Sequence, residues 1–319
     1  MNGPLTWPRL FFKFIACLSL FILRPKNLLA LNLVSIPPTC PVTWIYLFAL
    51  FETATSRSDY VVGWIDSFAK GKSLGRGLIH EARYLGENED TDPQKSLNPK
   101  SQELPKRIFG IFPKSWMWLL LLPFTNRPGM RFVNTVKYWL GRIFDHGKPF
   151  KQGLVAFNFL LDYIPNWKKV YLPGGFIQHQ SFIPAEYARK VVPQILEITH
   201  RHRIPPYLAV FKRHRKDAFL LSHGLDGYSL ALDFPIDSFS RGRILEMTRE
   251  LDGLICSCGG RFYAAKDATL QGESFRASLP EDAIRNFLAL KTKLDPQNLI
   301  QTDLGNRYFQ DGPLNPGIL

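Results

Sequence analysis

The sequence is poor in cysteine, with four residues in a chain of 319: Cys17, Cys40, Cys256 and Cys258. Four cysteines are too few to hold a chain of this size together by disulfide bonds, so a disulfide framework is excluded. The Cys256-Ser-Cys258 spacing does not fit CxxC redox chemistry, and no second Cys/His pair completes a zinc site. We therefore expect a reducing compartment and no metal.

The sequence also lacks an apolar run long enough to be an unambiguous membrane span. Residues 10–23 are apolar but interrupted by Lys13, and a span needs about 20 residues. A second apolar stretch from Leu28 is broken by Pro37-Pro38 and by Pro41. A signal peptide, a signal anchor, a transmembrane helix and a non-native segment each fit part of this region. We expect residues 1–45 to be an irregular hydrophobic extension, and both a membrane-associated and a cytoplasmic location stay open.

Acidic residues are outnumbered, since 40 Lys and Arg stand against 27 Asp and Glu, for a formal charge of +13. Such a balance permits a nucleic acid or an anionic membrane as partner. The basic residues are scattered, as at 200–203 and 212–216, and no nucleic-acid-binding motif is present. Scattered Lys and Arg side chains on solvent-exposed surfaces explain the positive charge. No nucleic-acid partner is therefore expected.

The apolar content of 45% is enough for a sizeable core, and one large domain is the economical expectation. Residues 86–106 are polar and contain proline, so they predict a loop or insertion. The stretch WMWLLLLPF at 116–124 is too short to cross a bilayer. It is either buried core or a lipid-facing lip beside a pocket for a hydrophobic substrate.

From Gly175 onward the pattern becomes regular and predicts an α+β fold. Strands are expected at 176–183, 207–212, 228–234 and 261–264, with helices at 184–203, through Pro193, and at 240–255. The order β-α-β-β-α-β is the split βαβ, ferredoxin-like arrangement, an antiparallel sheet with both helices on one face. Its other face is free to form a pocket floor.

A short string, GGRFYAAKD at 259–267, follows the last predicted helix. The two glycines end the helix and allow close approach of another backbone or a flat ligand. Tyr263 and Lys266 are three apart, so they share a face only if the chain bends after Ala264. One interpretation is a core Tyr beside a Lys paired with Asp267. The other is a phenol and an ammonium facing a polar or anionic group.

This string resembles the closing segment of FAD-linked oxidases of the vanillyl-alcohol-oxidase type. It is most similar to decaprenyl-phosphoryl-ribose oxidases and more distantly to delta(24)-sterol reductases. Four further blocks resemble the same family in the same order, and together they span roughly residues 45 to 310: YVVGWIDSFAKGKSLGRG at 60–77, FIQHQ at 176–180, the pair YLAVFK at 207–212 and SLALDFP at 229–235, and LDP…TDL at 294–304.

The resemblance implies FAD as cofactor, a substrate domain over 46–258 and a return segment toward the flavin over 259–319. In this family an FAD-binding domain with glycine-rich loops precedes the substrate domain, because backbone N–H groups can crowd a pyrophosphate only where no side chain intervenes. Before Tyr60 the only glycine here is Gly3. The chain thus resembles the later part of such an oxidase, and FAD binding is expected only where a flavin domain is supplied.

The resemblance also assigns candidate site residues. The resemblance implies that Tyr263 and Lys266 are catalytic and cofactor-binding. For the glutamines of 176–180, the spacing alone would instead indicate solvent-facing side chains of an exposed strand. The implied substrate-binding residues are Trp64, Gln178, Gln180, Lys212, His214 and Ser229. The lining departs from the ribose oxidases, since His214 replaces an aromatic, Ser229 and Ala231 replace Asn and Cys, and Asn158 replaces a Tyr.

The expected function is an FAD-linked dehydrogenation of a CH–OH group in a sugar- or polyol-like or lipid-linked substrate. A Lys with a lowered pKa would take the hydroxyl proton. Two alternatives stay open: reduction of a C=C bond, as in sterol reductases, and a non-catalytic or truncated protein without flavin.

Overall fold

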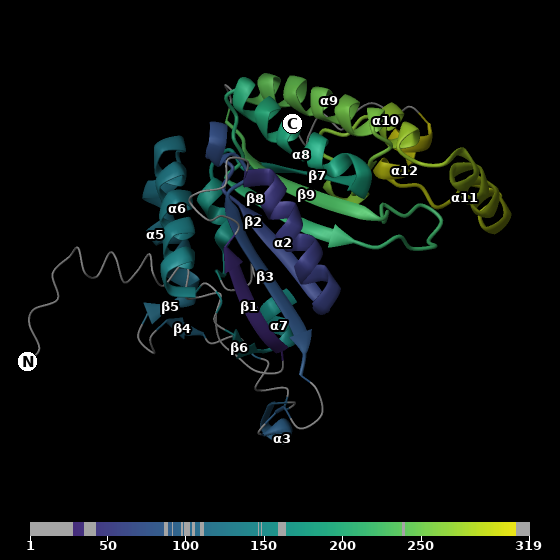
Figure 1. Ribbon diagram of the computed structural model, residues 1–319. Coiled ribbons are helices and arrows are strands. Elements are labelled where there is room, and N and C mark those ends of the chain that lie inside the picture. Colours follow the sequence, from purple (N-terminus) through teal and green to yellow (C-terminus); the bar gives the residue numbers. More distant parts are fainter. Residues whose placement is uncertain are drawn as a thin grey trace, which may run out of the picture. The chain divides into compact units, whose positions relative to one another are not determined.

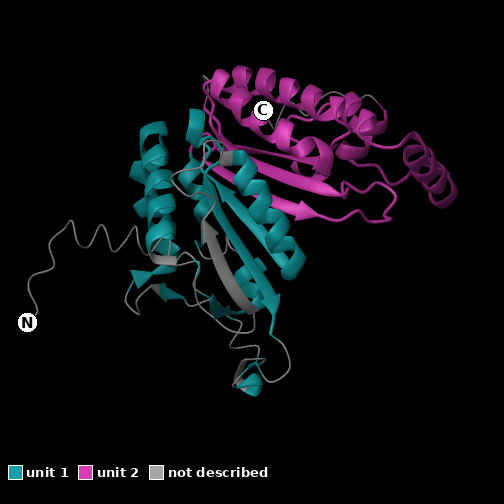
Figure 2. Cartoon of the chain, in the orientation of Figure 1, with its two compact units in different colours: residues 1–172 teal, residues 173–319 magenta. Residues whose placement is uncertain are grey.

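The computed structural model describes residues 28–34 and 43–310, except 86–88, 91, 97, 99–102, 104–105, 109–111, 146, 148, 159–163 and 238–239. The chain forms two compact units, residues 1–172 and 173–319 (Figure 2). Their boundary differs from the domain limits expected at 45 and 258. The division into substrate domain and return segment stays a prediction.

Unit 1 is built on an antiparallel sheet of strand order β6-β1-β3-β2. The strands are β1 (Leu28–Val34), β2 (Tyr60–Ile65), β3 (Gly77–Tyr84) and β6 (Pro149–Gln152). Helix α2 (Thr43–Arg57) packs on β2 and β3. Its buried residues recur every three or four positions, the period of a helix with one apolar face: Trp44, Leu47, Phe48, Phe51 and Ala54.

The expectation of an irregular extension up to residue 45 is wrong for Leu28–Val34. This segment pairs with β3 on one side and with β6 on the other. A seven-residue apolar run fits a buried strand as well as part of a membrane segment, and only its pairing distinguishes the two. Residues 1–27 lie outside the described part of the chain. Among the described residues no helix is long and apolar enough to cross a membrane.

The remaining elements of unit 1 follow β3. The polar region 86–106 contains only one described turn of helix, α3 (Pro93–Ser96). Beyond it come the pair β4 (Arg107–Ile108) and β5 (Phe112–Pro113), then α5 (Met117–Leu121), α6 (Arg127–Leu140) and α7 (Leu154–Asn158). The buried-core interpretation of 116–124 is wrong, because Met117 is its only buried residue and Trp116 is 57% exposed.

Unit 2 confirms the predicted β-α-β-β-α-β order (Figure 1). Its sheet has the strand order β10-β7-β9-β8 with every pair antiparallel. The elements are β7 (Phe176–Pro184), α8 (Ala185–Arg201), β8 (Leu208–His214), β9 (Gly227–Pro235), α9 (Arg241–Ser257) and β10 (Arg261–Phe262).

Both helices cover the same face of this sheet, as predicted. Helices α8 and α9 contact each other and both contact β7 (Figure 1). The side chains that β7 and β9 turn toward them are buried, including Ile177, Ile183, Leu230 and Leu232. Each Å² of apolar area that these side chains remove from water stabilises unit 2 by about 25 cal/mol. We call the opposite face, which α8 and α9 do not cover, the open face. It carries Gln178, Gln180 and Asp233, although Asp233 and Ser229 on it are buried.

The two glycines after α9 have separate roles. Gly259 has φ +68°, a conformation that ends a helix and that side chains other than glycine disfavour. A Cβ on Gly260 would stand 2.7 Å from the carbonyl oxygen of Phe182 in β7. The pair therefore turns the chain and brings β10 against β7. The predicted strand at 261–264 ends at Phe262, and a 3-10 turn (Ala264–Lys266) follows.

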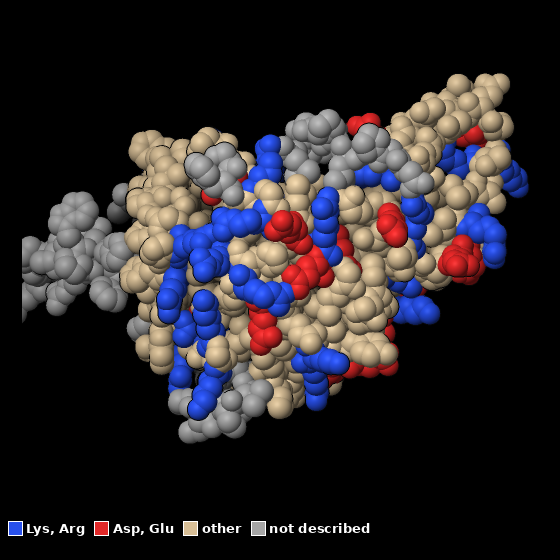
Figure 3. Space-filling model, turned by 90° about the horizontal axis from the view of Figure 1, so that it is seen from above, with Lys and Arg blue, Asp and Glu red and all other residues tan. Residues whose placement is uncertain are grey.

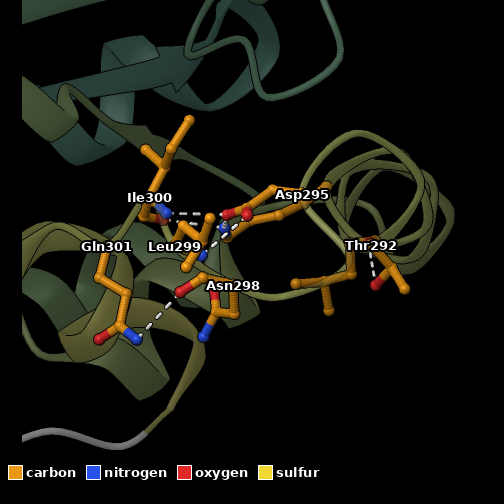
Figure 4. A network of polar contacts seen from close by, with 8 residues as sticks. Thr292, Asp295, Asn298, Leu299, Ile300 and Gln301 are labelled. Atoms are coloured by element: carbon orange, nitrogen blue, oxygen red, sulfur yellow. Dashed lines mark hydrogen bonds and ion pairs between the residues drawn. The ribbon is translucent and has the colours of Figure 1, made fainter.

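The chain ends in α10 (Gly272–Ala277), α11 (Glu281–Leu294) and α12 (Asp303–Phe309). The Asp295 carboxylate accepts hydrogen bonds from the backbone N–H groups of Leu299 (2.8 Å) and Ile300 (3.0 Å), as Figure 4 shows. It also accepts one from Lys291 Nζ at 2.7 Å. Thr302 then caps α12 by accepting from the N–H of Gly305. The LDP…TDL block thus has a structural role in shaping the link between two helices.

Candidate active site on the open face of the second sheet

The glutamines of β7 lie on the open face because side chains alternate along a strand. His179, between them, points to the helices and its Nε2 lies 2.9 Å from Oδ1 of Asp252 in α9. Gln178 and Gln180 therefore point the other way. Their direct partners on β9 are Asp233 and Ala231.

Lys266 is held on this open face by Gln180. Its Nζ donates a hydrogen bond of 2.7 Å to Gln180 Oε1 and lies 5.5 Å from the centroid of the Tyr263 ring. The predicted bend exists, since the N–H of Lys266 bonds to the carbonyl of Tyr263 within the 3-10 turn. Asp267 does not pair with Lys266 but forms an ion pair with Arg307 of α12. The interpretation of Lys266 as a partner of Asp267 is therefore wrong.

The Lys266 ammonium is in an environment that disfavours its charge. Burial lowers the pKa of Lys266, the negative charge of Asp233 raises it, and the positive charge of Lys212 lowers it further. The net direction is downward, so the neutral amine, which is the form that can accept a proton, is favoured more than in a free lysine.

Asp233 was not among the residues assigned from the sequence. Its side chain is fully buried and neither carboxylate oxygen has a hydrogen-bond partner within bonding geometry. Burial raises the pKa of Asp233 to about 6, while the neighbouring amide of Gln178 and the charge of Lys266 act in the opposite direction. A buried carboxylate with unsatisfied oxygens is costly, so such groups are frequent at sites that receive hydrogen-bond donors.

Tyr263 lies opposite Gln180, to whose carbonyl its own N–H bonds at 3.2 Å. Its ring meets His223 edge-on, with centroids 4.8 Å apart. His223 also contacts the ring of Phe182, at 4.6 Å. These contacts place an imidazole beside the phenol, and burial lowers the pKa of His223.

The loop that carries His223 joins β8 to β9 and is fixed by its own hydrogen bonds. Ser222 Oγ donates to Asp217 Oδ2 at 2.7 Å and accepts from the N–H of Gly224 at 2.8 Å. Arg261 donates to the carbonyls of Ser222 and Gly224, at 2.8 and 3.0 Å. The loop position is therefore set by β10, the strand that leads to Tyr263.

Lys212, His214 and Ser229 lie together on the same face. Lys212 is exposed and stands directly opposite Ser229, whose Oγ is 2.7 Å from His214 Nε2. The His214 ring also contacts Phe182, at 4.9 Å. Burial, with the nearby charge of Lys212, lowers the pKa of His214 to about 4. The imidazole is thus neutral at physiological pH.

Trp64 belongs to unit 1. Its buried ring lies under Lys137 of α6, with Nζ 4.4 Å from the ring centroid. Burial lowers the pKa of Lys137 to about 8, and burial together with that ammonium lowers the pKa of His80 to about 3. The ring of Trp64, an implied substrate-binding residue, therefore contacts an ammonium whose pKa is lowered by burial.

Among the described residues, no group of three or more His, Cys, Asp or Glu side chains could hold a metal ion. No protein-family model matches the chain. Over 273 residues it is 28% identical to decaprenylphosphoryl-beta-D-ribose oxidase of Mycolicibacterium smegmatis. That match covers 81% of this chain and 54% of the oxidase. This chain is a relative of that oxidase. It spans about half of the length of the relative it matches.

Proposed function

We propose that this chain supplies the substrate site and the proton acceptor of an FAD-linked oxidoreductase that dehydrogenates a CH–OH group. The proposed substrate is sugar- or polyol-like, or lipid-linked. The observation that carries the proposal is the position of Lys266, bonded to Gln180, beside Tyr263 and within the electrostatic reach of Asp233. The relationship to an oxidase that acts on a decaprenylphosphoryl ribose supports the reaction class.

Lys266 is the proposed base. Dehydrogenation removes a proton from the hydroxyl oxygen and a hydride from the carbon, and the proton would pass to the neutral amine at Nζ. Gln180 Oε1 holds that nitrogen in place at 2.7 Å. Positive charge on Lys266 after the transfer is stabilised by Asp233, whose charge raises the pKa of Lys266.

Asp233 and Gln178 are the proposed substrate-orienting pair. They face each other across β7 and β9. The unsatisfied oxygens of Asp233 can accept hydrogen bonds, and the amide of Gln178 can both donate and accept. Because Asp233 is fully buried, a substrate hydroxyl reaches its oxygens only when the side chains that cover them move. A polyol offers several such hydroxyls, whereas a plain sterol nucleus does not.

The fit of FAD to the described residues is partial. Lys266 and Tyr263 suit a position facing the isoalloxazine, which when bound would accept the hydride. No glycine-rich loop opens an α-helix among the described residues, so none of them is assigned to the pyrophosphate. We therefore assign residues of this chain to the isoalloxazine only, and none to the pyrophosphate.

The test is flavin reduction in a protein that joins this chain to an FAD-binding domain. Anaerobic mixing with ribose-type and polyol substrates, free and lipid-linked, would be followed at the visible flavin band. Lys266→Met should slow single-turnover reduction by about 10²-fold or more. Lys190→Met, an exposed lysine on α8, is the matched control and should leave the rate unchanged. An unchanged rate in Lys266→Met would remove the base from the proposal.

A further inference from the structure

Unit 1 exposes large apolar side chains on consecutive elements around α5 and α6. Trp116 is 57% exposed, Trp139 46% and Ile143 63%. Leu119, Leu120 and Phe132 are also exposed. We call these six residues the apolar ridge. A contiguous apolar surface on a folded protein usually marks a binding site.

The ridge has a geometric basis in α6 and its continuation. Phe132, Trp139 and Ile143 are separated by seven and four positions, so they lie along one side of the helix. Asn134 and Tyr138 are buried on the other side. An ordinary surface helix buries its large apolar residues, whereas α6 exposes two of them and the turn after it exposes a third on the same side.

The short segment before α6 continues the same surface. Trp116 ends a 3-10 turn that leads into α5, and Leu119 and Leu120 follow within that helix. After α5 the ring of Phe124 stacks on that of Phe132, with centroids 6.0 Å apart. The contact fastens the α5 segment to α6, so the two contributions to the ridge are held together.

The sequence interval that carries the ridge has charge of one sign between its two bounding acidic residues. Between Glu103 and Asp145 the sequence has no acidic residue, but it has seven basic ones. Figure 3 shows Lys and Arg side chains gathered on part of the face seen from above, with Asp and Glu side chains beside them. The basic residues of this interval are Lys106, Arg107, Lys114, Arg127, Arg131, Lys137 and Arg142, of which Lys106, Arg107, Arg127 and Arg131 are exposed.

We propose that the apolar ridge and its exposed basic residues dock the protein on the surface of an anionic lipid bilayer. Half-exposed Trp rings with leucines, in a segment rich in exposed basic residues, match the two parts of such a surface, acyl boundary and headgroup. A protein partner fits less well, because interface cores are depleted of lysine and ringed by charges of both signs. With only five residues, α5 lies on the membrane and does not cross it.

The experiment is flotation of the full chain with vesicles of phosphatidylcholine and phosphatidylglycerol in equal parts, against vesicles of phosphatidylcholine alone. Trp116→Ser with Trp139→Ser should abolish most flotation. Arg107→Gln with Arg131→Gln alters exposed side chains only, and it should weaken binding about fivefold per charge. Leu294→Ser with Leu299→Ser is the matched control, since these leucines are 73% and 77% exposed in unit 2.

All variants keep the apolar residues 10–23, so any difference between them reports on the ridge. Circular dichroism checks that each variant is folded. The proposal is supported by anionic-lipid flotation that falls with salt and in both ridge variants but not in the control. It is overturned if the arginine variant floats like wild type, or if the control loses as much. A dimer in size-exclusion chromatography that the tryptophan substitutions dissociate would also overturn it, in favour of a second copy.

Discussion

Asp267 forms an ion pair with Arg307 of α12, and this pairing leaves the neighbouring Lys266 to bond with Gln180. Two adjacent residues of opposite charge therefore point to different parts of unit 2. The acidic one fastens the C-terminal helix, and the basic one stays on the open face of the sheet. A salt bridge between the two would have withdrawn Lys266 from that face.

Removal of Asp267 should destabilise unit 2. The Arg307 side chain is 7% exposed, so Asp267→Ala leaves a buried guanidinium without its counter-ion. A loss of about 3 kcal/mol in the free energy of unfolding is expected. Urea titration measures it. Arg201→Ala, which breaks a pair with Glu250 in which both side chains are exposed, is the control and should cost less than about 1 kcal/mol. Equal losses would show that the Asp267 pair is no more important than a surface contact.

The 319-residue chain alone should bind FAD weakly, with a visible flavin band far below one equivalent after gel filtration. The reason is that no described glycine-rich loop opens a helix that could hold the pyrophosphate. The measurement is the absorption spectrum of the purified protein after incubation with excess FAD. A stoichiometric band would mean that FAD is held by other residues of this chain.

Asp233→Asn should change how stability depends on pH. Because the folded state raises the pKa of Asp233 from 3.8 to about 6, it binds the proton more tightly than the unfolded chain does. Stability from this group is present at low pH and is lost as the pH rises from about 4 through 6. The loss is on the order of 3 kcal/mol, since one pKa unit corresponds to about 1.4 kcal/mol.

The asparagine variant should therefore become more stable relative to wild type as the pH increases over that range. Urea unfolding of both proteins at several pH values gives the difference in their free energies of unfolding. Titrating groups that both proteins share contribute equally to the two values and cancel in that difference. A difference that stays constant between pH 4 and 7 would show that Asp233 is not held as a costly carboxylate.

His214 should act in the opposite direction. Its pKa is about 4 in the folded state, against 6.5 for an ordinary histidine. The unfolded chain takes up the proton first, so stability falls as the pH decreases from about 6.5 toward 4. His214→Phe removes this titration and retains a ring against Phe182.

The His214→Phe variant should lose less stability than wild type as the pH decreases. Its melting temperature should therefore fall less between pH 7 and 4.5. Some acid loss will persist, because His80, with a pKa of about 3, titrates in the same sense. His202→Phe, altering a histidine paired with Glu250 outside the open face, is the comparison. An identical acid loss in wild type and His214→Phe would contradict the burial of this imidazole.

The sequence predicted the order of elements in unit 2 because alternation and breakers are local signals. β7 and α9 were each placed within two residues, and the glycines marked the end of α9. β1 was missed because an apolar run carries no mark of its pairing partners. The exposure of Trp116 could not be predicted from the sequence either, because composition does not show which apolar residues other parts of the chain will bury.

The candidate site was predictable in part. Strand alternation and the family resemblance together indicated Gln178 and Gln180, and the same alternation would have added Asp233, four residues after Ser229 on one face. His223 was not predictable, because it comes from a loop without periodicity. Its position depends on hydrogen bonds from Arg261, a residue far along the chain.

The alternation of β7 has an evolutionary consequence. Gln178 and Gln180 face the polar side, whereas Ile177 and His179 face the helices. Substitutions at positions 178 and 180 can change ligand preference, while the residues at 177 and 179 keep the unit folded. Selection for ligand and selection for stability therefore act on different residues of one strand. A substrate range could diverge here without loss of the scaffold. A single-residue insertion in β7, by contrast, would exchange the two sets and remove both properties together.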